Sequence, residues 1–157
     1  MRRGIRYVPQ GMQELPAGYS VLGIPVTLRR DSPHHARTAG FFGMYWIEVN
    51  EHFFYLPFDE QHAILLHECG HVRLHHLLFR LLLLPLAWTN WVKTLCWKQE
   101  FDADTFACKQ GYARPMLQYL RRARDDTASE YHPPPSMRRK AIEFFMHNGV
   151  PLCESSC

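Results

Sequence analysis

The pattern of hydrophobic and polar positions changes at Asp59. Before it, short runs of β-branched and aromatic residues alternate with turn formers, which is typical of strands. The runs that we interpret as strands are Ile5–Val8, Val21–Leu28, Tyr45–Val49 and a returning strand Phe53–Leu56 that stops at Pro57. The pattern therefore predicts a small N-terminal sheet, which we expect to be antiparallel.

The second part of the chain is predicted to be helical. Asp59 can cap a helix, and apolar residues then continue to Pro85 without a breaker other than Gly70, so one long helix is expected. Three further helices are predicted: Trp91–Lys109 ended by Gly111, Arg114–Arg124 with Pro115 in its first turn, and Ser136–Met146 after the prolines 133–135. The expected fold class is α+β, mostly α.

Composition indicates one globular unit. The chain has 157 residues, of which 46% are hydrophobic and 21% charged, which fits a single domain over residues 1–150 with a tail at 151–157. The net charge of +3 is slight and the basic clusters are short, so no nucleic-acid partner is predicted. Five cysteines, an odd number, and a start unlike a signal peptide favour a cytoplasmic location. A metal or redox role for Cys153 and Cys157 stays open beside the preferred loose tail.

A leucine-rich segment from His76 to Val92 leaves two interpretations open. It is divided by Arg80 and Pro85, and a spanning helix needs about 20 apolar residues, so it is too short to cross a bilayer. The preferred interpretation is a buried helix end and turn. The alternative is a substrate-binding or peripheral membrane-surface hairpin over Leu77–Trp91, with Trp88 and Trp91 as interfacial anchors.

The motif that carries chemistry is His67-Glu68-Cys69-Gly70-His71, which has the form H-E-x-x-H inside the predicted long helix. Positions four apart share a helix face, so His67 and His71 can bind one Zn²⁺ ion while Glu68 sits beside the open coordination position. Glu68 is therefore the candidate general base. The following His75 and His76 are expected to be surface or partner residues, because a straight helix seldom delivers three ligands to one ion.

A third ligand is needed, and Glu100 on the next predicted helix is a suitable one. Asp104 follows one helical turn later on the same face, where it can accept the second ring hydrogen of a zinc-bound histidine. The small Ala103 between them would let the two helices pack closely. The alternative for Glu100 and Asp104 is a solvated acidic helix face.

These blocks resemble the gluzincin peptidases of the HtpX, Oma and CAAX-prenyl-protease type, which pair H-E-x-x-H with a downstream E-x-x-A-D. A third block of those relatives, a His-Pro pair with an arginine six residues after the histidine, matches His132-Pro133 and Arg138. The resemblance covers residues from about 59 to 145. It implies a zincin-like fold in which His132 stabilises the oxyanion and Arg138 orients it or the substrate.

The chain also departs from those relatives. They usually have membrane-spanning helices and an Asn-Ala-Phe element, for which Asn50 is the nearest candidate here. A weaker similarity to the ImmA-type peptidases rests on residues 67–76 and does not account for Asp104 or the His132 block.

The expected function is a zinc-dependent metalloendopeptidase, with a peptide or protein substrate lying along a strand such as Tyr45–Val49. Two alternatives remain: a catalytically silent, zinc-stabilised binding module, and a membrane-surface adaptor with a structural metal.

Overall fold

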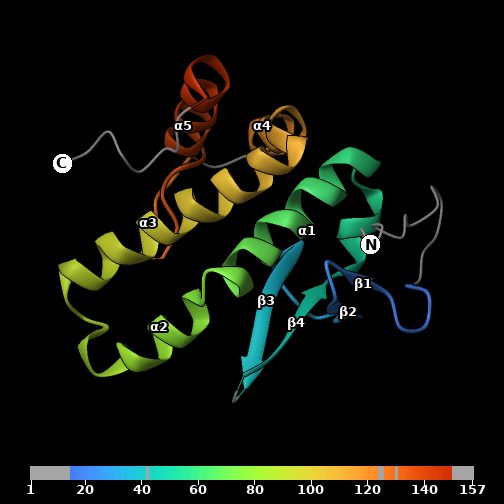
Figure 1. The fold of residues 1–157 in the computed structure, drawn as a ribbon, viewed down its shortest axis with the longest axis horizontal. Helices are drawn as coiled ribbons and strands as arrows, with labels where there is room; N and C mark the ends of the chain where they lie inside the picture. Colours follow the sequence, from blue (N-terminus) through green and yellow to red (C-terminus); the bar gives the residue numbers. More distant parts are fainter. Residues whose placement is uncertain (1–14, 42, 124–125, 130, 150–157) are drawn as a thin grey trace.

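The structure, a computed structural model, describes residues 15–41, 43–123, 126–129 and 131–149. Two expectations lie outside the described residues, namely the predicted strand Ile5–Val8 and the tail with Cys153 and Cys157. Within the described part, a small sheet precedes a set of helices, so the α+β class is confirmed (Figure 1).

The sheet has a mixed topology. Its strands are β1 (Ser20–Val21), β2 (Ile24–Leu28), β3 (Ala36–Phe41) and β4 (Met44–Val49), in the order β1-β2-β4-β3. The pairs β1–β2 and β3–β4 are antiparallel, but β2 and β4 run parallel, with Val26 opposite Ile47. The expectation of a fully antiparallel sheet is therefore wrong at this pair. The chain turns back after β3 to form an antiparallel pair with β4, so β4 runs in the same direction as β2.

The predicted strand Phe53–Leu56 is also wrong, because this segment is the 3₁₀ helix η1 (Glu51–Tyr55). The Asn50 side chain accepts a hydrogen bond from the Phe53 backbone N–H at 3.0 Å and so caps the turn. Phe53 is completely buried in the core. A local cap and one buried ring thus outweigh the strand propensity of the aromatic residues.

The predicted long helix is two helices. α1 (Phe58–Arg73) ends at Leu74, His75 takes a left-handed conformation with φ 57°, and α2 (His76–Leu82) begins there. In a continuous helix, residues five apart lie about 140° apart around the axis. The break instead brings His76 back toward His71, on the buried side of the chain.

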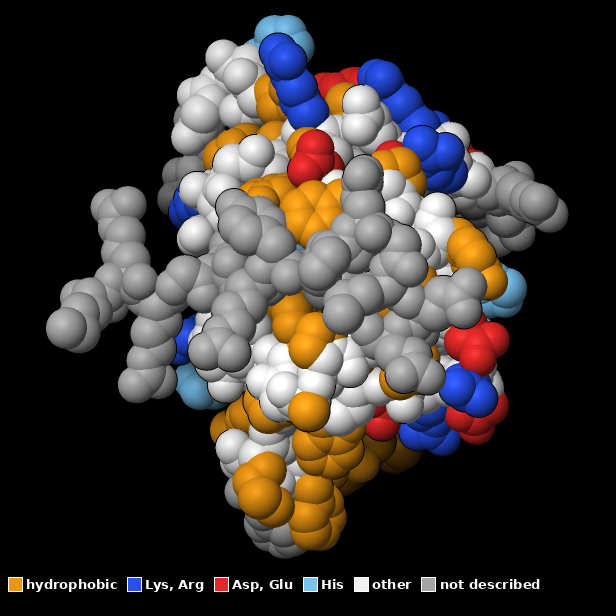
Figure 2. Space-filling view, turned by 90° about the vertical axis from the view of Figure 1, so that its right-hand side faces the viewer, with side chains coloured by type: hydrophobic (Ala, Val, Ile, Leu, Met, Phe, Trp, Pro, Cys, Tyr) orange, Lys and Arg blue, Asp and Glu red, His pale blue; other side chains and the backbone are white. Residues whose placement is uncertain are grey.

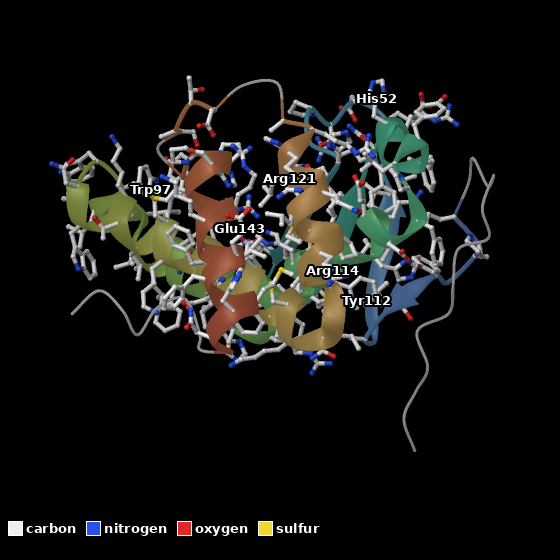
Figure 3. The ribbon with its side chains drawn as sticks, turned by 90° about the horizontal axis from the view of Figure 1, so that it is seen from above. His52, Trp97, Tyr112, Arg114, Arg121 and Glu143 are labelled. Atoms are coloured by element: carbon white, nitrogen blue, oxygen red, sulfur yellow. The ribbon has the colours of Figure 1, made fainter. Side chains whose placement is uncertain are left out.

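The remaining helices are η2 (Leu84–Leu86), α3 (Asn90–Ala107), the π-helical turn η3 (Cys108–Tyr112), α4 (Ala113–Arg121) and α5 (Pro135–Asn148). After α1 the described chain therefore has four α-helices rather than the three expected. α1 packs against the sheet on one side and α3 on the other (Figure 1). α4 and α5 lie side by side, and Arg121 Nη2 on α4 is 3.4 Å from Glu143 Oε1 on α5 (Figure 3).

One buried polar cluster stabilises the sheet through Glu48 of β4. Its carboxylate accepts hydrogen bonds from Arg37 at 2.7 Å, Trp46 Nε1 at 3.1 Å and Arg29 at 3.3 Å. Burial raises the pKa of Glu48, but the hydrogen bonds and charges of these partners outweigh it, so the pKa lies below its ordinary value.

The leucine-rich segment is not buried, so the preferred interpretation of it is wrong. Leu81 and Leu82 are 61% and 66% exposed, and Trp88 is 80% exposed. α2, η2 and the start of α3 form a helical hairpin that extends from the body of the molecule (Figure 1). Among the helices of the described residues, none combines the length and the apolar character needed to cross a membrane.

Candidate metal centre

His67, His71 and Glu100 form one buried group. His67 Nε2 and His71 Nε2 are 3.2 Å apart, and the two oxygens of Glu100 lie 3.5 Å and 3.4 Å from these nitrogens. One ligand atom from each residue can be chosen so that all three lie within 4.8 Å of one another. The three residues expected as ligands are thus together, and they could hold a metal ion.

Close packing of α1 on α3 brings His67 and His71 next to Glu100. A Cβ added to Gly70 would stand 3.0 Å from the Cα of Ala103 and 3.1 Å from the Cβ of Phe106, so only glycine fits without displacement. The small Ala103 allows this approach from the other side, as the sequence predicted. Because Gly70 lies next to His71 and Ala103 lies between Glu100 and Asp104, the contact aligns the ligands of the two helices.

Asp104 fixes the orientation of His67. Asp104 Oδ1 lies 2.8 Å from His67 Nδ1 and accepts its hydrogen, which leaves Nε2 facing His71 and Glu100. Burial alone lowers the pKa of His67, but the hydrogen bond and charge of Asp104 outweigh it and raise the pKa to about 9. This is the contact expected from the spacing of Glu100 and Asp104.

Arg138 on α5 neutralises Asp104. Its Nη2 and Nε donate to the two oxygens of Asp104 at 2.6 Å and 2.8 Å, and Asp104 is fully buried while the Arg138 side chain is 12% exposed. Burial raises the pKa of Asp104, but the charge and hydrogen bonds of Arg138 outweigh it and lower the pKa. Arg138 also lies 3.8 Å from Glu100 Oε2 and lines the adjacent cleft. Its contacts in the structure support the ligands, and its role toward an oxyanion or substrate stays a prediction.

One oxygen of Glu100 fits a metal ligand. Oε1 accepts a hydrogen bond from Arg80 at 3.0 Å, whereas the buried Oε2 has no correctly directed hydrogen bond among the described residues. Burial raises the pKa of Glu100, but the imidazoles of His132 and His67 outweigh it and hold the pKa well below its usual range. An ionised, buried oxygen without a directed donor, 3.5 Å from the Nε2 nitrogen of His67, is what a divalent cation would satisfy.

His71 has an orienting partner that the sequence did not reveal. His76 is only 4% exposed, and its Nδ1 lies 2.9 Å from His71 Nδ1, so one ring donates to the other. Burial lowers the pKa of His76 to about 4 and that of His71 well below its ordinary value, so both rings are neutral. The expected surface position is wrong for His76, which is buried, whereas His75 is exposed.

Glu68 is held by Thr38 of the strand β3. The Thr38 hydroxyl lies 2.6 Å from Glu68 Oε2 and 3.0 Å from the Glu68 backbone oxygen. A hydroxyl has a single hydrogen, and the shorter contact with the charged oxygen is the better hydrogen bond. Thr38 therefore fixes the carboxylate of the candidate base. No motif in the sequence indicated this contact.

His132 reaches the group from a loop that α3 holds in place. The Trp97 indole N–H, on α3 in Figure 3, donates to the Ser129 backbone oxygen at 3.2 Å, and the Ser129 hydroxyl accepts from the His132 backbone N–H at 3.0 Å. His132 Nδ1 then lies 3.1 Å from Glu100 Oε2. The imidazole is half-exposed, so it borders both the ligand group and the solvent.

A cleft opens beside the group. It consists of two hollows of about 260 and 190 Å³, each below the roughly 300 Å³ of a typical small-molecule pocket. The two share His34, Ala36, His67, Glu68, Glu100 and His132, so they lie next to each other. His34 and His35 had no spacing signal in the sequence, yet both line the cleft.

Comparisons with protein-family models, with curated protein sequences and with solved structures found no significant match. The resemblance to gluzincins therefore rests on the three sequence blocks.

Proposed function

We propose that this chain is a zinc-dependent metalloendopeptidase in which Glu68 is the general base. The observation that carries the proposal is the buried group of His67, His71 and Glu100 beside a cleft that Glu68 also lines. A stabilising metal site could be closed on all sides, whereas a catalytic one needs an open position for water and substrate. The cleft supplies that open side.

The donor set favours zinc. Two imidazole nitrogens and one carboxylate oxygen are the protein ligands of many catalytic zinc sites, and hard cations such as Mg²⁺ and Ca²⁺ prefer oxygen ligands alone. The hydrogen bond from His67 to Asp104 and the contact of His71 with His76 supply the outer partners that zinc-binding histidines require.

Zinc bound there would lower the pKa of a water to about 7 and polarise a carbonyl group. Glu68, held by Thr38, would accept the proton of the attacking water and pass it to the leaving amine. His132, half-exposed and 3.1 Å from Glu100, would donate to the developing oxyanion.

The strand that we expected to pair with the substrate is an inner strand of the described sheet. β4 contains the expected Tyr45–Val49 and lies between β2 and β3. From Ile47 to Val49 it is paired with a strand on each side. β3 is the last strand of the described sheet, and its residues Ala36 and Thr38 line the cleft. We propose that an extended peptide pairs with β3, because a free strand edge offers backbone donors and acceptors.

The test is a zinc and cleavage assay on one preparation. We expect one zinc ion per chain and cleavage of unfolded casein, and we expect Glu68→Gln to keep the zinc while losing roughly 10²- to 10⁴-fold of the activity. Glu143→Gln, at an exposed carboxylate of α5, is the matched control and should cleave as the wild type does.

The remaining outcomes separate the alternatives. Bound zinc without cleavage of any of several unfolded substrates would replace the peptidase with the zinc-stabilised binding module. Cleavage that Glu68→Gln leaves unchanged would remove Glu68 as the base.

A further inference from the structure

The leucine hairpin, which we define as residues 76–92, exposes an unusual density of large apolar side chains. Those that are more than two-fifths exposed are Leu78, Phe79, Leu81, Leu82, Leu84, Leu86, Trp88 and Trp91. Isolated exposed leucines are normal, but a continuous run of this kind marks a surface that binds something.

A second segment adds to the same end of the molecule. Phe41 and Met44, at the ends of β3 and β4, are 65% and 66% exposed, and α2 contacts β3. Figure 2 shows hydrophobic side chains gathered at the lower end of the molecule, where Figure 1 places both the turn between β3 and β4 and α2. Two segments distant in sequence therefore present apolar residues together.

The charged residues in the hairpin and directly beside it are all basic. No acidic residue occurs between Glu68 and Glu100, whereas Arg73, Arg80, Lys93 and Lys98 fall in that interval. Arg80 is paired with Glu100 and Lys98 with Asp102, and Arg73 donates to the Leu22 backbone oxygen. Arg73 and Lys93 are both exposed beside the base of the hairpin. The apolar end is thus bordered by positive charge.

We propose that the leucine hairpin and the adjoining ends of β3 and β4 bind the surface of an anionic lipid bilayer. The leucines and Phe79 would enter the boundary of the acyl chains, and Trp88 and Trp91 would lie among the headgroups, where amphipathic rings are favoured. The basic residues at the base would face anionic headgroups. This proposal does not depend on the peptidase function.

The exposure pattern favours lipid over a protein groove. A helix that docks in a groove exposes one apolar face, with anchors at helical spacing. Here the successive residues Leu81 and Leu82 are both exposed, as are Leu84, Pro85 and Leu86. Side chains that point in several directions fit a fluid apolar phase, which surrounds the end of the hairpin.

Binding would also orient the cleft. Leu77 and Arg80 of α2 line the second hollow, beside His67 and Glu68. The base of the hairpin is therefore one wall of the cleft. A bilayer at the end of the hairpin would keep the cleft close to the membrane surface.

The experiment is flotation with phosphatidylcholine vesicles, with and without phosphatidylglycerol. We expect the full chain to float with the anionic vesicles and to float less in high salt, because salt screens the headgroup charge. Trp88→Ser with Trp91→Ser should lower the partition coefficient by roughly tenfold or more. Tyr55→Ser is the control, because Tyr55 is 76% exposed on η1, outside the hairpin, and it should change partitioning less than about twofold.

Every other outcome overturns the proposal. Absence of flotation with both vesicle types, or flotation that the double tryptophan variant leaves unchanged, excludes this lipid surface. A dimer in sedimentation that the double variant dissociates, without flotation, assigns the surface to a second copy of the chain. Circular dichroism melting checks that the variants fold. Glu68→Gln should float like the wild type, because lipid binding does not require Glu68. A negative flotation result would therefore contradict the lipid proposal and leave the peptidase proposal untouched.

Discussion

Gly70 on α1 and Ala103 on α3 meet so closely that a Cβ on Gly70 would stand 3.0 Å from the Ala103 Cα and 3.3 Å from its carbonyl oxygen. The contact is made by backbone atoms, which cannot rotate away as the end of a side chain can. The separation of the two helices, and with it the separation of the imidazoles from Glu100, is therefore set at this point.

Gly70→Ala tests that spacing. Replacing a helical glycine by alanine usually stabilises by about 0.5–1 kcal/mol, whereas overpacking costs about 1–3 kcal/mol. We expect the overpacking to dominate, so the free energy of unfolding should fall by about 1 kcal/mol and zinc affinity should also fall. Urea denaturation and zinc titration measure the two effects. A variant as stable as the wild type, with unchanged zinc affinity, would show that the helices can separate freely.

Asp104→Asn should weaken zinc binding by roughly 10- to 100-fold, because His67 loses the charged acceptor that orients its ring. It should also destabilise the protein by about 3 kcal/mol, because Arg138 then keeps only its 3.8 Å contact with Glu100 Oε2 as a charge partner. Asp102→Asn is the matched control on the same helix, where Asp102 pairs with Lys98 at the surface. Competition with a chromogenic chelator measures the affinity. Equal effects of the two substitutions would contradict a specific role for Asp104.

His76→Leu should lower zinc affinity by roughly tenfold, since His71 Nδ1 then has no ring nitrogen beside it. His75→Asn is the control, because His75 is exposed and asparagine tolerates its left-handed conformation. Zinc titration of both variants gives the comparison. If His75→Asn reduced affinity more than His76→Leu, the contact between His71 and His76 would not be the orienting one.

Thr38→Val should lower the kcat for peptide cleavage by roughly tenfold and leave KM nearly unchanged, because it removes the hydroxyl that holds Glu68. Zinc content should not change. Thr38→Ser keeps the hydroxyl and should retain most of the activity. A loss of kcat as large in Thr38→Ser as in Thr38→Val would point to packing rather than to the hydrogen bond.

Glu48→Gln should destabilise the protein by about 1–2 kcal/mol at neutral pH, because the carboxylate accepts from Arg37, Trp46 and Arg29. The pKa of Glu48 is lowered in the folded protein, so its stabilisation is fully present above the ordinary pKa of 4.5 and disappears as the pH falls through the folded value. Denaturation at pH 7 and at pH 3 should therefore show a smaller difference between variant and wild type at the lower pH. Glu51→Gln, at an exposed ion pair, serves as the control.

Helix periodicity and motif spacing predicted much of the ligand group. His67 and His71 share a face of α1, and Glu100 and Asp104 share a face of α3, because a regular helix fixes these relationships locally. Thr38, His76 and Arg80 were missed as contacts because they depend on where β3 lies against α1 and on the break at His75. No local pattern contains such tertiary relationships.

The sheet was less predictable for a similar reason. β3 has the sequence Ala-Arg-Thr-Ala-Gly-Phe, which has few of the β-branched and aromatic residues that indicate strands. β3 is a strand because it pairs with β4, not because its composition favours a strand. Once β3 is missed, the parallel pair of β2 and β4 cannot be inferred, and β4 is mistaken for an edge.

α2 serves two sides of the molecule at once. His76 contacts His71 and Arg80 contacts Glu100 in the candidate metal centre. Leu81 and Leu82, at the end of the same seven-residue helix, are exposed. Seven residues of helix span only about 10 Å, so the two ends of α2 lie close together. We therefore expect a displacement of its outer leucines to shift His76 relative to His71 and Arg80 relative to Glu100, which lie within two helical turns of them.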